Sequence, residues 1–180
     1  IVKKVVINDN GGTKGAADFA FDVAGPSASS DVSFEADGQN DLTVNAGTYN
    51  VTENVAAGYS TTYSADCANA VVVNGGSKTC TITNDDVAGT LIVKKTVIND
   101  NGGTMKATDF KFKLDGGAAV AFVQDGGNTL AGKNTLSVAA DRHAEGEDAL
   151  PSAGHTTTYS NCADVSVANG ATQTCEITND

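Results

Sequence analysis

The chain has 180 residues, with 11 Lys and Arg against 22 Asp and Glu, and a formal net charge of −11 at pH 7. Phosphate backbones are bound by clustered cations, so this acidic balance argues against a nucleic-acid partner. No apolar run approaches the ~18 residues that a membrane-spanning helix needs. Frequent Gly, few Pro and no sustained apolar pattern at helical spacing predict an all-β protein.

The sequence contains the same unit twice. The opening stretch "IVKKVVINDNGGT" at Ile1 returns at Ile92 as "IVKKTVINDNGGT", with one difference. Further along, "STTYSADC" pairs with "TTTYSNC", and "SKTCTITND" pairs with "TQTCEITND". We therefore predict two tandem domains, 1–86 and 89–180. The connection "DVAG" is too short for a flexible tether, so we expect two rigid domains set nearly end to end.

The predicted strands follow one another closely in each copy. "IVKKVVI" ends in the turn "NDNGG", and "DFAFDV" alternates apolar and polar residues. Strands are also predicted in "DLTV" from Asp41, in "TYNVTEN", in "YSTTYS" and in a closing hairpin, "AVVV-NGGS-KTCTITN". About seven short strands per copy predict a small, Ig-like antiparallel β-sandwich. The residues that alternation places on one face are Phe19, Phe21 and Val23, and in the second copy Phe110, Phe112 and Leu114.

Two lysines of the first strand are expected on opposite faces, because strand residues alternate sides. The position that differs between the copies, Val5 or Thr96, is assigned to solvent. Lys4 and Lys95 then lie on the core side. They share it with the aliphatic residues Val2, Val6, Val93 and Val97. Burying a charged lysine is costly, so we expect something to compensate for it.

Three stretches carry a family resemblance: "VKK…NDNGG", "TYNVTEN…GY" and the terminal "CTITN". They resemble the prealbumin-like, collagen-adhesin B-type domains of bacterial surface proteins and pilins, and the resemblance spans both copies. In that family a first-strand Lys and a last-strand Asn form a spontaneous isopeptide bond, assisted by a Glu of a "Y-x-x-x-E" strand. For the first copy the resemblance implies a bond between Lys4 and Asn84, with Glu53 as the assisting acid.

The second copy departs from the family pattern in its "HAEGEDALPSAGH" stretch. Lys95 and Asn179 align cleanly as the implied bonding pair. The implied acid is Glu147, by alignment with the first copy. Glu145 shares the same face of the strand and stays open as an alternative.

The chemistry of such a bond suits these residue types. A lysine must be neutral to attack a carboxamide, and burial among aliphatic side chains lowers the pKa of a lysine. A protonated Glu would polarise the amide carbonyl and shuttle protons as ammonia leaves. The product is a neutral amide, which removes the cost of a buried charge. Two alternatives are an edge-strand Lys4 that reaches out to solvent, and a buried Lys–Glu ion pair without a bond.

Each copy holds one pair of cysteines with the same separation of 13 residues: Cys67 and Cys80, then Cys162 and Cys175. The repeated spacing predicts one disulfide per domain, each stabilising by about 3 kcal/mol in the chain-entropy model, and an extracellular or cell-surface location. If "NGGS" turns a hairpin, Val71 faces Cys80. Cys67 must then reach back from the preceding loop, or the bridge joins the two sheets. A zinc site is disfavoured because the first copy has no His.

Two histidines and one loop are weaker candidates. His143 and His155 occur only in the second copy, where the first has Tyr, and are expected to be tolerated surface or rim residues. Asp9 and Asn10 in "NDNGG" resemble part of a calcium loop, but the spaced carboxylates and terminal Glu of such a loop are missing. Turn chemistry explains the motif, and we predict no metal and no cofactor.

The repeated features favour a structural role over catalysis. We predict a non-enzymatic subunit of an extracellular or cell-surface filament, pilus or stalk, present as a homopolymer or as part of a long tandem array. Whether subunits join by strand donation or as one long chain stays open. The alternatives are an adhesin or ligand-binding surface module, against which the low aromatic content argues mildly, and an accessory domain of a secreted enzyme.

Overall fold

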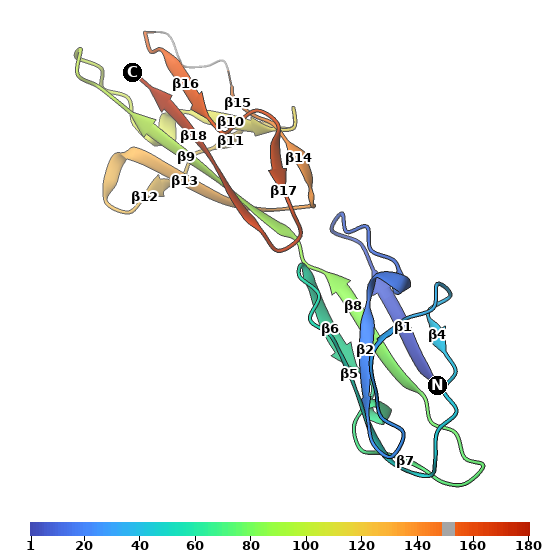
Figure 1. The fold of residues 1–180 in the computed structure, drawn as a ribbon. Helices are drawn as coiled ribbons and strands as arrows, with labels where there is room; N and C mark the ends of the chain where they lie inside the picture. Colours follow the sequence, from blue (N-terminus) through green and yellow to red (C-terminus); the bar gives the residue numbers. More distant parts are fainter. Residues whose placement is uncertain (149–153) are drawn as a thin grey trace. The chain divides into compact units, whose positions relative to one another are not determined.

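The computed structural model describes residues 1–148 and 154–180, which form two compact units (Figure 1). Unit 1 is Ile1–Val87 and unit 2 is Ala88–Asp180. The helices among the described residues are short 3-10 turns, and none has the length and hydrophobicity needed to cross a lipid bilayer. The predicted all-β class is confirmed.

Unit 1 is a sandwich of two four-stranded sheets, with strand orders β4-β1-β8-β6 and β3-β2-β5-β7. Its strands are β1 Val2–Ile7, β2 Ala20–Ala24, β3 Ser29–Ser33, β4 Gln39–Asn40, β5 Gly47–Glu53, β6 Tyr59–Tyr63, β7 Ala70–Val72 and β8 Cys80–Asp86. The first and last strands, β1 and β8, pair in parallel, whereas the other strand pairs of the unit are antiparallel. The two ends of the unit's sequence therefore lie side by side in one sheet.

Unit 2 repeats this plan with a wider main sheet. Its described strands are β9 Gly89–Val97, β10 Lys111–Leu114, β11 Val120–Ala121, β12 Gln124–Asp125, β13 Asn128–Val138, β14 Asp141–His143, β15 Glu145–Glu147, β16 Thr157–Ser160, β17 Val165–Val167 and β18 Thr172–Asn179. The main sheet has the order β12-β13-β9-β18-β16, and β9 and β18 are again parallel. The other described strands form a three-stranded sheet, β11-β10-β15, and a two-stranded sheet, β14-β17.

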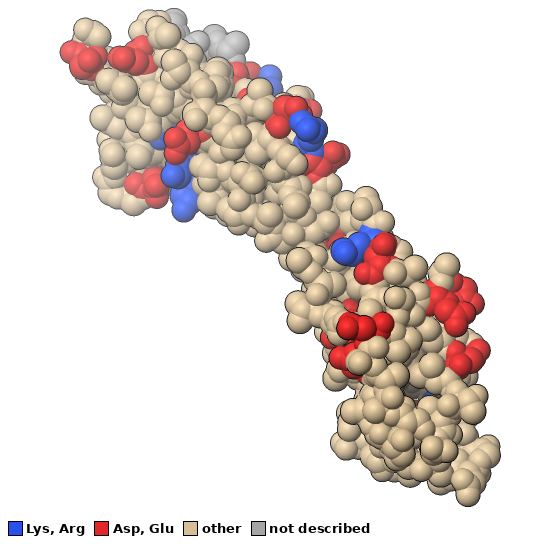
Figure 2. All heavy atoms as spheres, viewed as in Figure 1, with Lys and Arg blue, Asp and Glu red and all other residues tan. Residues whose placement is uncertain are grey.

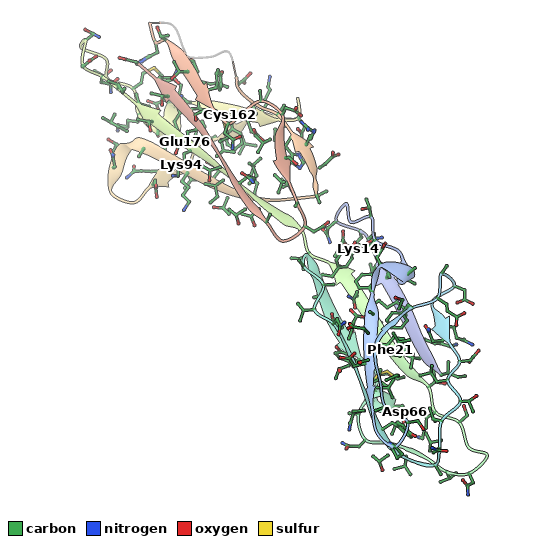
Figure 3. The ribbon with its side chains drawn as sticks, viewed as in Figure 1. Lys14, Phe21, Asp66, Lys94, Cys162 and Glu176 are labelled. Carbon is green, nitrogen blue, oxygen red and sulfur yellow. A yellow bond between two sulfur atoms is a disulfide. The ribbon has the colours of Figure 1, made fainter. Side chains whose placement is uncertain are left out.

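The cores are built from the alternating residues that the sequence indicates. Phe21, labelled in Figure 3, is fully buried in unit 1 together with Phe19 and Val23. In unit 2, Phe110 and Phe112 are fully buried. Leu114 is partly buried against the same cluster. Apolar burial of this kind is the main term that stabilises each sandwich.

The lysines of the first strand separate by face as predicted. In β9, Lys94 lies on the outer face (Figure 3), where its Nζ is 3.4 Å from Glu176 Oε1 on the neighbouring strand β18. Lys95, one residue on, is 1% exposed. In unit 1, Lys4 is also buried, and β1 lies between β4 and β8. The edge-strand alternative for Lys4 is therefore wrong.

Two predicted elements are wrong. The closing hairpin does not form, because β7 pairs with β5 and β8 lies in the other sheet between β1 and β6. The turn residues "NGGS" reverse the chain, but they also carry it from one sheet to the other. The strand expected from Asp41 is absent as well: the pairing with β1 ends at Asn40, and residues 41–46 run without strand pairing.

Candidate functional site

The candidate site of unit 1 is formed by strands from both sheets. Lys4 on β1 lies opposite Ile82 of β8 in the parallel register. Asn84 is two residues further along β8, so its side chain lies on the same inner face. Glu53 is the last residue of β5 in the opposite sheet, where it faces Phe21 of β2. The register of two sheets therefore places an amine, a carboxamide and a carboxyl together inside the sandwich.

These three side chains form a closed set of hydrogen bonds. Lys4 Nζ lies 2.6 Å from Asn84 Oδ1 and also contacts Glu53 Oε2. Asn84 Nδ2 donates to the other carboxylate oxygen, Glu53 Oε1, at 2.6 Å. One carboxyl group thus contacts both the lysine amine and the amide nitrogen of the asparagine.

The surroundings of this set are apolar and closed to solvent. The side chains of Lys4 and Glu53 are both 0% exposed. The Lys4 amine lies 4.0 Å from the ring centroid of Phe19 and 5.3 Å from that of Phe34. Burial lowers the pKa of Lys4 below its usual value, and the hydrogen bond and charge of Glu53 only oppose this shift in part. This shift makes the neutral, nucleophilic form of the amine more accessible than it is for a lysine in water.

Unit 2 holds the same three residue types at the same register. Lys95 Nζ contacts Asn179 Oδ1 and lies 3.1 Å from Glu147 Oε1. An aromatic ring again lies beside the amine: the ring centroid of Phe110 is 4.2 Å from Lys95 Nζ. Burial again lowers the pKa of Lys95, against the hydrogen bond and charge of Glu147.

A threonine separates the acid from the asparagine in unit 2. Thr157 Oγ1 donates to Glu147 Oε2 at 3.0 Å and accepts from Asn179 Nδ2 at 3.1 Å. The carboxyl therefore reaches the amide nitrogen through a hydroxyl, whereas Glu53 of unit 1 reaches it directly. Sequence reasoning missed Thr157. The only sequence signal for it is the "TTTY" stretch, which is weak because threonine is common in strands.

Of the two acids considered for unit 2, Glu147 is the one in contact with Lys95. Glu145 is buried two residues away on β15, and neither of its carboxyl oxygens has a hydrogen-bond partner among the described residues. Burial raises the pKa of Glu145 to about 7, and the nearby charge of Asp115 adds to this shift while His143 opposes it.

The arrangement fits an internal condensation between amine and carboxamide. In such a condensation the lysine nitrogen would be the nucleophile and the asparagine carbonyl carbon the electrophile. A carboxyl group in contact with the attacking amine and with the leaving nitrogen can accept a proton from the first and give one to the second. All three groups are on one chain and already lie in contact, which is the arrangement that such a condensation would need.

The sequence matches the family of prealbumin-like fold domains over residues 1–82 and again over residues 86–179. The chain belongs to this family. A comparison with curated proteins gave no match.

Solved structures are similar to the chain at low sequence identity. The TIE protein of Bacillus anthracis aligns with 99% of this chain at 18% identity and a TM-score of 0.53. The chain spans 34% of that structure's length, about a third. The major pilin T-13 of Streptococcus pyogenes aligns with 99% of this chain and 95% of its own at 15% identity and a TM-score of 0.37. A single B repeat of the collagen-binding surface protein of Staphylococcus aureus aligns over the same shares at 18% identity and a TM-score of 0.31.

Each prealbumin-like unit contains one disulfide, Cys67–Cys80 in unit 1 and Cys162–Cys175 in unit 2. Cys67 ends the 3-10 turn Ala65–Cys67 that follows β6, and Cys80 begins β8. The bridge therefore ties the loop before β7 to the first residue of the last strand. No β7–β8 hairpin intervenes, so the mismatch with Val71 that a hairpin would create does not arise.

His143 of the second prealbumin-like unit is not a surface residue. It is 8% exposed, its Nε2 lies 2.9 Å from the Ala139 carbonyl, and its Nδ1 lies 2.8 Å from Asp115 Oδ2. Tyr49, at the matching position in unit 1, donates to the carbonyl of Asn45, also four residues earlier. Although burial opposes it, the bond to Asp115 raises the pKa of His143. The expectation of a surface or rim residue is wrong for His143, because its imidazole takes the buried place of the Tyr49 ring and makes the corresponding hydrogen bond.

Among the charged residues of the prealbumin-like units, acidic ones outnumber basic ones, 22 to 11. On the face drawn in Figure 2, acidic side chains cover several areas, and the basic side chains are scattered, mostly beside acidic ones. Exposed ion pairs join Lys78 to Asp66 at 3.1 Å and Lys113 to Asp148 at 2.8 Å. That face does not present the clustered cations that phosphate backbones attract.

Proposed function

We propose that this chain is a structural segment of an extracellular or cell-surface filament, pilus or stalk. In this proposal each unit is braced by an intramolecular isopeptide bond, Lys4–Asn84 in unit 1 and Lys95–Asn179 in unit 2. One observation carries the proposal: in both units a lysine of the first strand and an asparagine of the last strand are buried together against one glutamate.

The proposed step is a balanced condensation. The lysine amine attacks the asparagine side-chain carbonyl, a new C–N bond forms, and the bond to the amide nitrogen breaks. The proton lost by the amine and the proton gained by the leaving nitrogen pass through Glu53 in unit 1, and through Glu147 and Thr157 in unit 2. Ammonia leaves, and no oxidant or cofactor enters. The product has no charge at the former amine, which ends the cost of holding an ammonium away from water.

The position of the bond suits a load-bearing element. In unit 1 the two residues are 80 apart in the sequence but lie on adjacent parallel strands at the unit's two ends. Tension applied to the ends would run from Lys4 to Asn84 through the new bond. Residues 5–83 would then be shielded from the force. The disulfides support an oxidising location outside the cell.

Intact mass measurement tests the chemistry. Each isopeptide bond removes about 17 Da as ammonia, so the purified chain should be about 34 Da lighter than its sequence mass after reduction of the disulfides. Lys4→Ala and Glu53→Gln should each restore one ammonia. Lys3→Ala, at the exposed neighbouring position, is the matched control and should leave the loss unchanged.

The same variants test how much the proposed bonds stabilise each unit. A link between residues 80 apart is worth about 4 kcal/mol by chain entropy, so unit 1 of Lys4→Ala should melt lower by about 15 °C or more. A full sequence mass in the wild-type chain would overturn the proposed bonds.

Electron microscopy of native material then tests the assembly: filaments support it, and isolated monomers contradict it.

A further inference from the structure

A tyrosine hydroxyl contacts the backbone of the buried glutamate in each unit. In unit 1 the hydroxyl of Tyr63 accepts the backbone N–H of Glu53 at 3.1 Å. In unit 2 the hydroxyl of Tyr159 accepts the backbone N–H of Glu147 at 3.3 Å. Each tyrosine belongs to the sheet that carries the lysine and the asparagine, whereas each glutamate belongs to the opposite sheet. The contact therefore links the two sheets at the glutamate.

In unit 1 the tyrosine lies on the inner face of an edge strand. Tyr63 of β6 pairs with Ile82 of β8, which pairs on its other side with Lys4 of β1. Side chains that pair across strands point to the same face of the sheet, and Ile82 and Lys4 are buried. Tyr63 itself is 45% exposed. Its ring thus lies at the rim of the sandwich, in the same row as the lysine.

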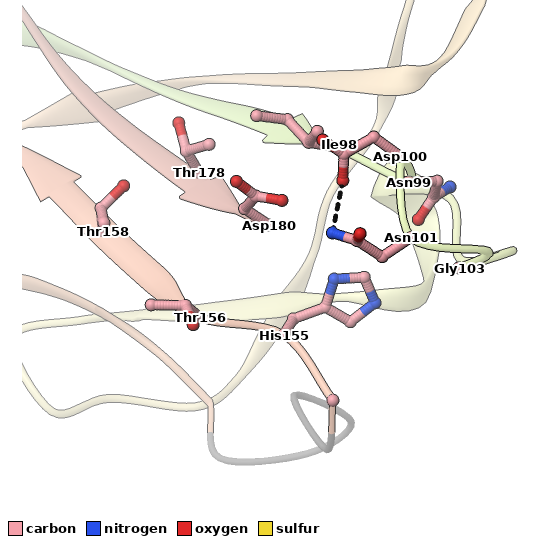
Figure 4. A pocket seen from close by; sticks show the side chains of 11 residues that line it. Ile98, Asn99, Asp100, Asn101, Gly103, His155, Thr156, Thr158, Thr178 and Asp180 are labelled. Carbon is pink, nitrogen blue, oxygen red and sulfur yellow. Dashed lines mark hydrogen bonds between the residues drawn. The ribbon is translucent and has the colours of Figure 1, made fainter.

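Unit 2 repeats this row with Tyr159, Ile177 and Lys95. Thr158 of β16 and its partner Thr178 of β18 line an open pocket on the other face of the sheet (Figure 4). Because strand residues alternate sides, the neighbouring Tyr159 lies on the face that carries the lysine. The two units therefore place their tyrosines alike.

The hydroxyl takes the place of a strand partner for the glutamate. Asn54, the residue after Glu53, donates its N–H to the carbonyl of Ala20 on β2 at 3.0 Å. Successive N–H groups of a strand point to opposite sides, so the N–H of Glu53 points away from β2. On that side β7 is the neighbour of β5, but the pairing of the two strands ends at Tyr49. The hydroxyl of Tyr63 satisfies the N–H beyond this end.

A fixed glutamate matters because its carboxyl makes two contacts at once. Glu53 contacts Lys4 with one oxygen, and the other oxygen accepts Asn84 Nδ2 at 2.6 Å. Both glutamates are the last residues of their strands, Glu53 of β5 and Glu147 of β15. A small displacement of a catalytic group can cost much of a reaction rate. An anchor at the strand end is therefore placed where it keeps the carboxyl in register.

We propose that Tyr63 and Tyr159 are positioning residues for the isopeptide bonds of the two units. Each hydroxyl fixes the backbone of the glutamate, and so holds the carboxyl where it can exchange protons with the amine and the amide. The tyrosines act through the glutamate and take no proton themselves. The inference rests on the proposed function, because a positioning residue has this role only if the bond forms.

Tyr63→Phe tests the proposal, because it removes the hydroxyl and keeps the ring. We expect the bond of unit 1 to form about fivefold more slowly, the factor that one hydrogen bond of ordinary strength supplies. The rate is measured during refolding of the full chain, by mass mapping of the peptides that contain Lys4 and Asn84. An unchanged rate would overturn the proposal.

Tyr59→Phe is the matched control. The Tyr59 hydroxyl also lies on β6 and also accepts a backbone N–H, that of Lys14 at 3.2 Å. Its loss removes a similar hydrogen bond from the same strand but leaves the glutamate anchored, so the bond should form at nearly the wild-type rate. Equal slowing in Tyr59→Phe and Tyr63→Phe would assign the effect to packing and overturn the proposal.

A second readout separates positioning from stability. Burial lowers the pKa of Lys4, and the hydrogen bond and charge of Glu53 oppose that shift. In an Asn84→Ala chain no bond can form in unit 1, so the Lys4 amine can be titrated by NMR. Adding Tyr63→Phe loosens Glu53 and should lower the pKa of Lys4 further, whereas Tyr59→Phe should leave it unchanged. An unchanged Lys4 titration with Tyr63→Phe would overturn the proposal.

Failure of this role is distinguishable from failure of the proposed function. If the wild-type chain keeps its full sequence mass, no bond forms and both proposals fall. If the wild-type chain loses ammonia and Tyr63→Phe reacts as fast, the bond stands and the positioning role alone is overturned.

Discussion

The two units place the same lysine, glutamate and asparagine in a buried sandwich, but they connect them differently. In unit 1 the carboxyl of Glu53 contacts Lys4 and the Asn84 amide directly. In unit 2 the hydroxyl of Thr157 stands between Glu147 and the amide. The comparison shows that the register of the first and last strands fixes the lysine and asparagine. The units differ in how the glutamate reaches the amide, which is direct in unit 1 and through a hydroxyl in unit 2.

A second difference lies two residues before the glutamate that contacts the lysine. Unit 1 has Val51 there, an ordinary core residue with 8% exposure. Unit 2 has Glu145, equally buried at 7% exposure and with neither carboxyl oxygen hydrogen-bonded within the described residues. Burying such a group costs free energy that a valine does not cost. At this position, therefore, unit 2 buries a titrating group where unit 1 buries a valine.

The largest effect expected from this comparison is a pH dependence confined to unit 2. The folded state holds the Glu145 proton up to about pH 7, whereas the unfolded chain releases it near the ordinary value of 4.5. The stability contribution is therefore full below pH 4.5 and is lost as the pH rises to about 7. The shift corresponds to about 3 kcal/mol. The raised pKa of His143 acts in the same direction, with its contribution lost as the pH rises through that pKa.

Glu145→Gln isolates the glutamate, because it removes the titration and keeps the size of the side chain. We expect the free energy of unfolding of unit 2 to fall less steeply between pH 4 and pH 8 in this variant, measured by urea titration with unit-specific NMR signals. Unit 1 of the same molecule is the control and should not change. Parallel pH profiles of wild type and variant would show that Glu145 ionises normally in the fold.

The next effect concerns the rate of the proposed bond in unit 2. Thr157→Val keeps the shape of the side chain but removes the hydroxyl that connects Glu147 to Asn179. We expect bond formation in unit 2 to slow by about tenfold or more, within the range by which positioned proton transfer assists catalysis. Time-resolved intact mass during refolding measures the loss of each ammonia.

Thr61→Val in unit 1 is the matched control, since Thr61 lies opposite Asn84 as Thr157 lies opposite Asn179. Unit 1 has the direct contact, so its bond should form at a nearly unchanged rate. A similar slowing in both units would mean that the threonines act through packing. An unchanged rate in both would remove Thr157 from the mechanism.

Much of this architecture could be predicted from the sequence because it is encoded at short range. Alternation along seven residues was enough to separate Lys4 from its exposed neighbours, and equal spacing was enough to indicate each cysteine pair. The alternating Phe19, Phe21 and Val23 likewise defined a buried face. The buried faces follow from the two-residue period of a strand, and the cysteine pairs follow from the sequence repeat, so neither depends on which strand lies next to which.

The features that the sequence did not predict depend on contacts between residues far apart in the chain. "NGGS" specifies a reversal, but whether β7 or β1 becomes the neighbour of β8 is decided by sheet packing over 80 residues. The widening of the main sheet of unit 2 by the long strand Asn128–Val138 was not foreseen either, because its "NTLAGKNTLSV" has a weak apolar pattern. Burial of His143 required knowing that Asp115 would lie beside it.

The smallest effect expected is that of the disulfides under tension. Cys67 and Cys80 both lie between Lys4 and Asn84 in the sequence, and Cys162 and Cys175 both lie between Lys95 and Asn179. With the proposed bonds in place, force on the ends of a unit bypasses these segments, so reducing the disulfides should not lengthen the stretched molecule. Single-molecule extension with and without reductant measures this.

In the variant with Lys4→Ala and Lys95→Ala, the same reduction should release the 13-residue loops and add about 4 nm per unit at ~3.3 Å per residue. Lengthening of the reduced wild-type chain would place the load on the disulfides and contradict the proposed force path.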